Sequence, residues 1–307
     1  MHVIGYRRLR STLFGLSLLL MAAPTTFAVG ATPAAAAVSG FGPYDCKPLH
    51  LDPDDFPSSP RIDNRFYPLV PGTRFVVQGS VLEDDGVLHP HRIETTVMPL
   101  TKVIDRVNTM VVLDVDIEDG VLQESELFFV AQDVHGAIWT FGEYPEEYDQ
   151  GTLVGADSTW LDGVRGARAG TAMLAHPRAG GAPYLQGLSK QIEFKDCARV
   201  FQTGQRTCTP LHCYDNVLVV DEYAPNDPDG GHQRKYYAPN IGNVKVTPVG
   251  GQQAEKLEVT SIRHLCAAQL APYLRYAIDQ DTRGYDVAGA IYGKAPPAKH
   301  TLRLGPC

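Results

Sequence analysis

From Thr73 onward, the chain repeats one pattern, in which short runs of alternating apolar and polar residues are separated by turn-forming residues. Three pairs of such runs each enclose a segment that favours a tight turn: Asp85-Gly86, Asp119-Gly120, and Asp133 to Gly136. We therefore predict three β-hairpins between residues 73 and 148. Further strands are predicted in the runs TAMLAH, YLQGLSKQIEFKDCARVFQ, NVLVVDEY, RKYYAP, NVKVTPV and KLEVTSI.

Helical patterns of about ten to fifteen residues do not separate these runs, which argues against a parallel α/β sheet. The exception is the segment from Cys266 to Asp281, which has a helical composition but contains Pro272. The pattern predicts an all-β, mainly antiparallel fold: a strongly curved sheet or incomplete barrel with a short helical C-terminal element. A β-sandwich is the alternative, because it also produces short strands at regular spacing.

The beginning of the chain has a different pattern. Three arginines within the first ten residues precede an apolar run from Leu13 to Ala23, and small residues follow. This arrangement is typical of a secretory signal peptide, and the apolar run is too short to be a permanent membrane span. Cleavage is expected after Ala37, with Ala28 as the alternative. We predict a secreted protein, extracellular or associated with the cell envelope, without a transmembrane segment.

These boundaries divide the chain into four predicted segments. Residues 1–37 are the signal peptide, and residues 38–64, rich in Pro and Asp, form an extended N-terminal strap. Residues 65–262 form the antiparallel β domain. Residues 263–307 form a C-terminal appendage that a disulfide tethers.

Six cysteines follow the predicted signal peptide, and an even number in an exported chain predicts three disulfides. Cys266 and Cys307 bracket the tail and are expected to pair, whereas Cys46 is expected to tie the N-terminal segment to another cysteine. Cys197 and Cys208 flank a Thr-Gly pair that is interpreted as a hairpin turn, so their pairing is preferred over the pairing of Cys208 with Cys213. The full set of candidates is Cys46, Cys197, Cys208, Cys213, Cys266 and Cys307.

The net charge of the chain indicates which classes of binding partner are disfavoured. Without the three arginines of the signal peptide, 24 basic and 35 acidic side chains remain, a formal net charge of −11. An acidic surface argues against binding to nucleic acid or to an anionic membrane. The sequence predicts no oligomeric state.

Three motifs occur in the order FYPLVPGTRFVVQG, FFVAQDVHGAIWTFGEYPEEY and KYYAPNIGNVKV. Together they resemble a family of secreted bacterial proteins of unassigned function, and the resemblance covers residues 62–262. The family pattern has Phe-Pro-Leu and Pro-Gly before a strand, an Ala-Gln-Asp turn before Trp-x-Phe-Gly-Glu, and a late Lys-Tyr-Tyr-Ala-Pro-Gly. This chain departs from it at Asn240, where the pattern prefers Gly, and in the tail from about Cys266. The resemblance implies export and β architecture, and it brings no activity.

Aromatic residues concentrate on the predicted strands. Trp139 and Phe141 are two residues apart, so both rings point to one face, where they fill the sheet interior or line a pocket. We predict a secreted, non-catalytic protein that binds a hydrophobic or amphipathic ligand, such as a lipid, in the curved sheet. The same rings would also suit an ordinary filled core. The predicted lining residues are Phe129, Trp139, Phe141, Tyr236 and Tyr237.

A metal site gives the alternative function. His89 and His91 are two residues apart on a predicted strand, so their imidazoles would share a face, and Asp85 lies in the adjacent turn. This set suits a divalent metal that activates water in a secreted hydrolase or lyase. A solvated strand end explains it equally well, because spacing identifies no third ligand. Common catalytic and nucleotide-binding motifs are absent from the sequence, so we expect no other cofactor and favour a protein that is not an enzyme.

Two groups of carboxylates remain. Asp114, Asp116 and Glu118 alternate with aliphatic residues and therefore share a strand face, which Glu124 and Glu126 would meet in a matching register. Close acids have raised pKa values or bind calcium. We favour a solvent-exposed face with the aliphatic residues packed inward, which leaves a structural or protein-interaction module as the third functional alternative.

One polar triad lies around the third predicted turn. His135 is close in sequence to Asp133 and Glu143, so the three side chains are a candidate site. Residues at tight turns are more often structural. We therefore interpret this stretch as a hairpin with one wall facing a cavity.

Overall fold

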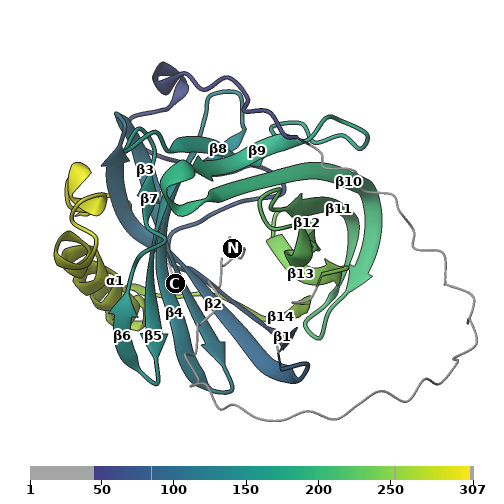
Figure 1. Cartoon of the computed structure of the whole chain (residues 1–307). Coiled ribbons are helices and arrows are strands. Elements are labelled where there is room, and N and C mark those ends of the chain that lie inside the picture. Colours follow the sequence, from purple (N-terminus) through teal and green to yellow (C-terminus); the bar gives the residue numbers. More distant parts are fainter. Residues whose placement is uncertain (1–44, 84, 252–253, 305–307) are drawn as a thin grey trace, which may run out of the picture.

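The computed structural model describes residues 45–83, 85–251 and 254–304, so the predicted signal peptide lies outside the described residues. Its antiparallel strands form one sheet in the order β1-β14-β13-β12-β11-β10-β9-β8-β5-β4-β3-β2. Strand β1 also pairs with β2, and this pairing closes the sheet into a barrel of 12 strands (Figure 1). The predicted all-β, barrel-like fold is confirmed, and the β-sandwich alternative is wrong because one sheet closes on itself.

The barrel strands are β1 (Thr73–Leu82), β2 (Leu88–Ile104), β3 (Val107–Glu118), β4 (Val121–Gln132), β5 (Ile138–Asp149), β8 (Arg168–Met173), β9 (Tyr184–Ser189), β10 (Phe194–Cys208), β11 (Cys213–Tyr223), β12 (His232–Ala238), β13 (Gly242–Val249) and β14 (Ala254–His264). Short strands β6 (Thr152–Gly155) and β7 (Trp160–Leu161) pair with β5, and β15 (Lys299–His300) pairs with β2. The helical elements of the described ranges are α1 (Ala267–Val287) and the 3-10 turns η1 (Pro53–Asp55), η2 (Lys190–Ile192), η3 (Pro228–Gly230) and η4 (Tyr292–Lys294).

The three predicted hairpins are present as β1–β2, β3–β4 and β4–β5. At the tip of β3–β4, Asp119 and Gly120 have φ angles of 50° and 78°. Asp and Gly tolerate this left-handed region better than most residues, which is why their occurrence between two apolar runs predicted the turn.

The outer face of β2 to β5 is covered by α1 and η4 (Figure 1). Leu113 and Phe129 point outward from β3 and β4 and belong to one buried cluster with Leu270 and Tyr292. The helix continues through Pro272 and ends at Val287, six residues beyond the predicted helical segment. Within the described ranges, no helix combines the length and the apolar character that crossing a membrane requires.

Two ion pairs connect α1 to the barrel wall. The buried Lys102 Nζ donates hydrogen bonds to Asp281 Oδ1 at 2.8 Å and to the Tyr285 hydroxyl at 3.0 Å. Arg283 donates two hydrogen bonds to the buried Glu146 carboxylate, at 3.0 and 2.7 Å. Because these groups lose their hydration on burial, removal of one partner is expected to be costly.

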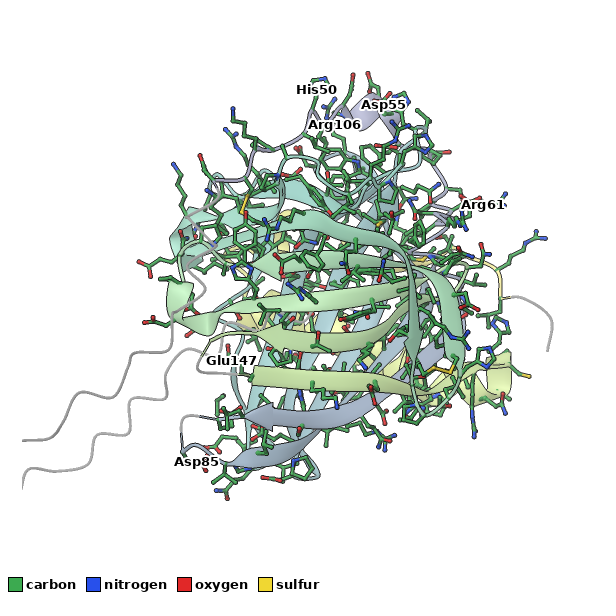
Figure 2. All side chains as sticks on the ribbon, turned by 90° about the vertical axis from the view of Figure 1, so that its right-hand side faces the viewer. His50, Asp55, Arg61, Asp85, Arg106 and Glu147 are labelled. Carbon is green, nitrogen blue, oxygen red and sulfur yellow. A yellow bond between two sulfur atoms is a disulfide. The ribbon has the colours of Figure 1, made fainter. Side chains whose placement is uncertain are left out.

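A plug segment, residues 61–69, closes one end of the barrel. Ile62, Tyr67 and Leu69 belong to a buried cluster whose other members come from strands all round the barrel, so this cluster occupies the interior. Gln132 Oε1 accepts hydrogen bonds from two plug amides, at 2.8 and 2.9 Å. The plug therefore sits at the end that contains the β4–β5 turn. Figure 2 places Arg61 near this end, with Asp85 and Glu147 at the opposite end of the strands.

The disulfides correct one prediction. Cys46 is bonded to Cys197, as an N-terminal tether should be, but Cys208 is bonded to Cys213. The preferred pairing of Cys197 with Cys208 is wrong, because β10 continues through the supposed turn and reverses only after Cys208, which is the register partner of Cys213. Cys266 is also disulfide-bonded. Its predicted partner, Cys307, lies outside the described residues.

Candidate functional site

Two rows of carboxylates line the interior wall formed by β3 and β4. The register pairs Asp114 with Glu126 and Asp116 with Glu124, so each pair shares one face of the sheet. That face is the interior one, because Phe128, two residues beyond Glu126, belongs to the central interior cluster. Asp114 and Glu126 are buried, whereas Asp116 and Glu124 are half-buried. The rows therefore run from the buried middle of the barrel towards its far end.

The interpretation of these carboxylates as a solvent-exposed face is wrong. Strand alternation was read correctly, but the assignment of the two faces is reversed. The aliphatic neighbours, such as Leu113, point outward into the cluster under α1. An apolar outer face is stable here because a helix covers it, and this leaves the carboxylates on the inner face.

A second polar group lines the interior from β9 to β12. Glu222 Oε2 lies 2.5 Å from Lys235 Nζ, and both side chains are buried. Glu222 Oε1 accepts hydrogen bonds from Gln186 Nε2 and from the Tyr237 hydroxyl, each at 3.3 Å. Asp196 on β10 is also buried, and burial raises its pKa, with a further rise from the charges of Glu143 and Glu222 and an opposing effect of Lys235. These strands thus contribute one lysine and two further carboxylates.

Glu143 on β5 connects the two groups. Its register partner is the interior residue Phe128, and its Oε2 accepts a hydrogen bond from Trp160 Nε1 at 2.8 Å. Its charge acts on both Glu126 and Asp196. We call the whole set the interior carboxylate cluster: Asp114, Asp116, Glu124, Glu126, Glu143, Asp196 and Glu222.

Burial dominates the electrostatics of this cluster. Burial and repulsion from neighbouring carboxylates raise the pKa of Glu124 to about 8, and burial raises the pKa of Glu143 to about 7. Burial also raises the pKa values of Asp114, Glu126 and Asp196, and the Glu143 charge raises the last two further. A desolvated carboxylate is less stable in its charged form, so burial favours the protonated form of these groups and a nearby cation would favour the charged form.

Several interior polar atoms lack a hydrogen bond of good geometry to any described residue. They include Oδ1 of Asp196, which is 2% exposed, Oε1 of Gln186 and the Tyr184 hydroxyl. Asp114, which is 5% exposed, has the Thr95 hydroxyl as a hydrogen-bond partner. Buried polar atoms nearly always have a partner in folded proteins. These atoms therefore point to water, an ion or a ligand as their partner.

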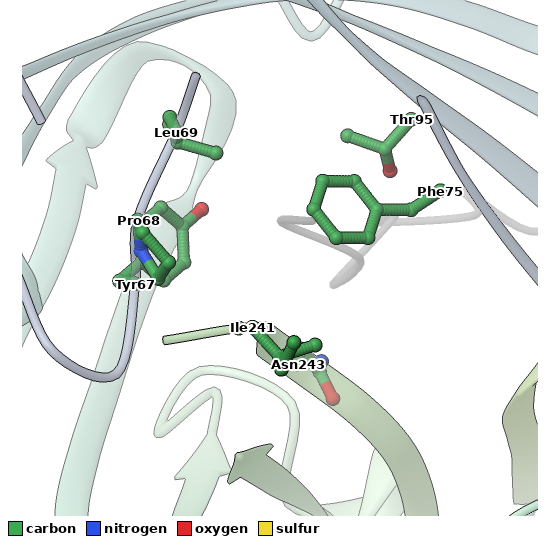
Figure 3. Close-up of a pocket in the computed structure, with 8 residues that line it drawn as sticks. Tyr67, Pro68, Leu69, Phe75, Thr95, Ile241 and Asn243 are labelled. Carbon is green, nitrogen blue, oxygen red and sulfur yellow. The ribbon is translucent and has the colours of Figure 1, made fainter. Parts of the chain in front are cut away.

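A pocket lies between the plug and strands β1, β2 and β13. Figure 3 shows Tyr67 and Leu69 of the plug on one side and Phe75 and Thr95 on the other. Its lining is mostly apolar, and its cavity volume is about 30 Å³. Asn243 Nδ2 in its lining is buried without a hydrogen-bond partner among the described residues, and the buried Thr95 hydroxyl interacts with Asp114.

The predicted aromatic lining residues divide between the two faces. Phe129 lies on the outer face, 6.1 Å from Tyr292 between ring centroids. Trp139 and Phe141 share the outer face and make edge contacts with Phe56 of the N-terminal strap, at 6.4 and 5.2 Å. Their rings share a face, as alternation requires, but that face lies under the strap and not within the barrel.

Tyr237 is the member of the predicted set that reaches the central interior cluster, where its ring lies 6.0 Å from Tyr67. Tyr236, its neighbour on β12, is half-buried at the edge of another cluster. As ligand-binding residues, all five remain a prediction.

The two predicted metal-binding histidines have different partners. His89 lies 2.7 Å from Asp119 through Nδ1 and 3.2 Å from Asp85 through Nε2. These hydrogen bonds raise the pKa of His89. Ligand atoms of His89, Glu118 and Asp119 lie within 4.8 Å of one another, so a metal site here would use Glu118 and Asp119. The predicted metal remains a prediction.

His91 lies apart from this group. Its Nε2 is 2.6 Å from Asp116, and its Nδ1 is 3.0 Å from Glu255. Burial opposes the charge of His91, but the two carboxylates outweigh burial and raise its pKa to about 10. An imidazolium has no lone pair for a metal, so this geometry makes His91 a cation of the barrel wall.

The candidate triad around the β4–β5 turn does not form. Asp133 accepts hydrogen bonds from the amides of His135 and Ala137 and from Trp139 Nε1, which makes it a structural turn residue. Glu143 faces the interior, as described above.

Sequence reasoning missed Asp196, Glu222 and Lys235. Each is the second of two adjacent charged residues within a strand run that is otherwise largely apolar or aromatic, as in VLVVDEY and RKYYAP. Successive strand residues point to opposite faces, so one residue of each adjacent charged pair must point inward, and this was the available signal. The three residues lie near one another because β10, β11 and β12 are consecutive, paired strands of the sheet.

No protein-family model matches this sequence, and no curated protein does. Two solved structures are similar over 65% of this chain and 99% of their own chains. One, from Parabacteroides distasonis, is proposed to be a lipoprotein and has 12% identity and a TM-score of 0.38. The other, from Bacteroides fragilis, is proposed to be an exported protein with a YmcC-like fold and has 14% identity and a TM-score of 0.39. At these TM-scores we draw nothing about function from them, and the resemblance carried by the three motifs stays a prediction.

Proposed function

We propose that this chain is an exported, non-catalytic binding protein that holds a small amphipathic ligand inside the barrel. The pocket beside the plug carries the proposal, because apolar walls there surround an unpartnered amide nitrogen, Asn243 Nδ2, and the Thr95 hydroxyl. Binding pockets for small molecules are typically apolar concavities with a few polar groups that fix orientation. The two disulfides of the described residues support export, since such bonds persist in oxidising compartments.

The size of the pocket limits the ligand. A cavity of about 30 Å³ has room for about two water molecules, so it suits the apolar end of a chain rather than a complete ligand. Thr95 connects this end to the rest of the interior, because its register partner is Asp114 of the carboxylate cluster. The polar part of the ligand would therefore lie on the side of Thr95 that faces the cluster.

The test uses the purified mature protein and three probes with the same apolar chain: octanol, octylamine and octanoate. Native mass spectrometry and isothermal titration calorimetry are expected to detect one-to-one binding of at least one probe. Ile241→Trp adds volume to a turn residue that lines the pocket, and it should weaken that binding about tenfold or more, since each lost methylene contact is worth about 0.8 kcal/mol.

Val134→Trp is the matched control, because Val134 lies in another turn and is 66% exposed. This variant should bind like the unmodified protein. If none of the three probes binds, or if Ile241→Trp binds them unchanged, the proposed function is wrong.

A further inference from the structure

The next inference rests on the proposed function and concerns the polar end of the ligand, for which a second set of observations is available. We infer that this end carries an ammonium group, which the interior carboxylate cluster binds. The inference concerns the chemical class of the ligand, and it stands on charge balance, unpartnered buried atoms and the spacing of the carboxylates.

The first step is charge balance. Lys235 pairs with Glu222, and His91 pairs with Asp116 and Glu255. The remaining carboxylates of the two walls have no such neutralisation: Asp114, Glu124, Glu126 and Asp196 form no ion pair with a described residue. An isolated buried charge is costly, so the interior favours either protons or an added cation.

The second step is hydrogen-bonding capacity. One oxygen of Asp196 is a buried acceptor without a hydrogen bond to the described chain, and the two buried oxygens of Asp114 share one hydroxyl donor, Thr95. They face the interior from opposite walls. An ammonium group supplies up to three N–H donors together with a positive charge, whereas an alcohol supplies one donor and a carboxylate supplies none. A cationic nitrogen is thus the group that satisfies both requirements.

The third step separates an ammonium from a metal ion. Among the described residues, the one set of three ligand atoms within 4.8 Å of one another is His89, Glu118 and Asp119, which lies at the β3–β4 tip. Successive interior side chains on one strand, such as Asp114 and Asp116, are about 6.6 Å apart. Cross-strand pairs such as Asp114 and Glu126 are closer, but among the described residues no third ligand atom joins them within 4.8 Å, so they do not form a chelating set. Each carboxylate can instead accept one N–H bond from an ammonium group or from water beside it.

This inference predicts that binding of the ligand releases protons from the carboxylate cluster. Binding of a cation next to Glu143 and Glu124, whose pKa values are about 7 and 8, should displace protons from them. The affinity for octylamine should therefore rise between about pH 6 and pH 8.5, where the amine itself stays protonated. Other charges act on the same groups: Asp114, Asp116 and Glu147 from the neighbouring strands, and Lys235 from β12 across the barrel. The proton count should thus be a property of the whole cluster.

The experiment is calorimetric titration of the mature protein with octylamine, octanol and octanoate at about pH 6, 7 and 8.5. Two buffers with different ionisation enthalpies at each pH give the number of protons released. Octylamine should bind about tenfold or more tightly than octanol, because hydrogen bonds to charged groups contribute about 1.5–3 kcal/mol, and octanoate should bind most weakly. Binding of octylamine should release protons at about pH 7.

Asp114→Asn and Glu126→Gln should each weaken octylamine binding about tenfold while leaving octanol binding unchanged, since they remove charge and keep the shape. Asp157→Asn makes the same charge change at an exposed residue and should have no effect. Circular dichroism checks that each variant is folded.

The outcomes separate the two claims. If octanol or octanoate binds as tightly as octylamine, or if both cluster variants bind octylamine unchanged, the ammonium inference is wrong while the proposed function stands. If no probe binds, both the proposed function and the ammonium inference are wrong.

Discussion

The raised pKa values of the interior carboxylates predict an unusual dependence of stability on pH. Glu143 has an ordinary pKa of 4.5 and a pKa of about 7 in the folded protein, because burial disfavours its charge. Between these values the folded state holds a proton that the unfolded state has released. The free energy of unfolding therefore contains a contribution that is fully present below about pH 4.5 and is lost as pH rises through 7.

The magnitude follows from the shift. A displacement of about 2.5 pKa units corresponds to at most about 3.4 kcal/mol, at 1.36 kcal/mol for each unit. The Glu143 side chain keeps partial contact with solvent, which screens the effect, so we expect about 1–2 kcal/mol. Glu124, with a folded pKa of about 8, and His91, with a folded pKa of about 10, add losses of the same sign at higher pH.

The assay is urea unfolding of the oxidised protein, followed by tryptophan fluorescence, at pH values from about 5 to 9. Glu143→Gln keeps an acceptor for Trp160 Nε1 but cannot titrate. This variant should lose about 1–2 kcal/mol less stability than the unmodified protein across that range, because the titration of Glu143 is absent. Asp157→Asn should follow the unmodified protein. Parallel stability curves for the unmodified protein and Glu143→Gln would refute the reasoning.

Two further predictions concern stability. Lys102→Met leaves the buried Asp281 without its cation and should lower the free energy of unfolding in urea by about 3 kcal/mol or more. Lys102→Met combined with Asp281→Asn should recover part of this loss, and an unchanged urea midpoint in the single variant would contradict the prediction. Replacing Cys46 and Cys197 with Ser should cost about 5 kcal/mol, and replacing Cys208 and Cys213 only about 2 kcal/mol, because the first bond closes a loop of 151 residues and the second a loop of 5. Equal losses in the two double variants would show that loop entropy is not the cause.

The fold class could be predicted because its signals are local. Alternating runs and Asp-Gly turns specify hairpins, and these signals lie within a few residues of each other. Closure of the barrel could not be predicted in the same way. Closure requires β1 to pair with β14 as well as with β2. Strands β1 and β14 are far apart in the sequence, and no local pattern indicates that they pair.

The site could be predicted only in part, for a related reason. A period of two shows that Asp114 and Asp116 share a face, and that Trp139 and Phe141 share another, but it does not show which face is the inside. The usual assumption places apolar residues inside. Here α1 and the strap bury the outer face, so the aromatic pair lies outside the barrel and the carboxylates lie within it.

This reversal has an energetic consequence that supports a binding role for the interior. The wall of β2 to β5 already gains apolar burial on its outer face, through the cluster shared with α1. Apolar residues on its inner face would add stability, whereas buried carboxylates with raised pKa values reduce the stability of the folded state at neutral pH. Titratable groups that destabilise the folded state and that converge from several strands are characteristic of functional sites. At such sites, burial shifts the pKa values of these groups even though this reduces stability. The unpartnered oxygen of Asp196 fits this account, as does Asp114, whose two buried oxygens share the Thr95 hydroxyl, because a bound cation would remove the repulsion and supply further hydrogen bonds in one step.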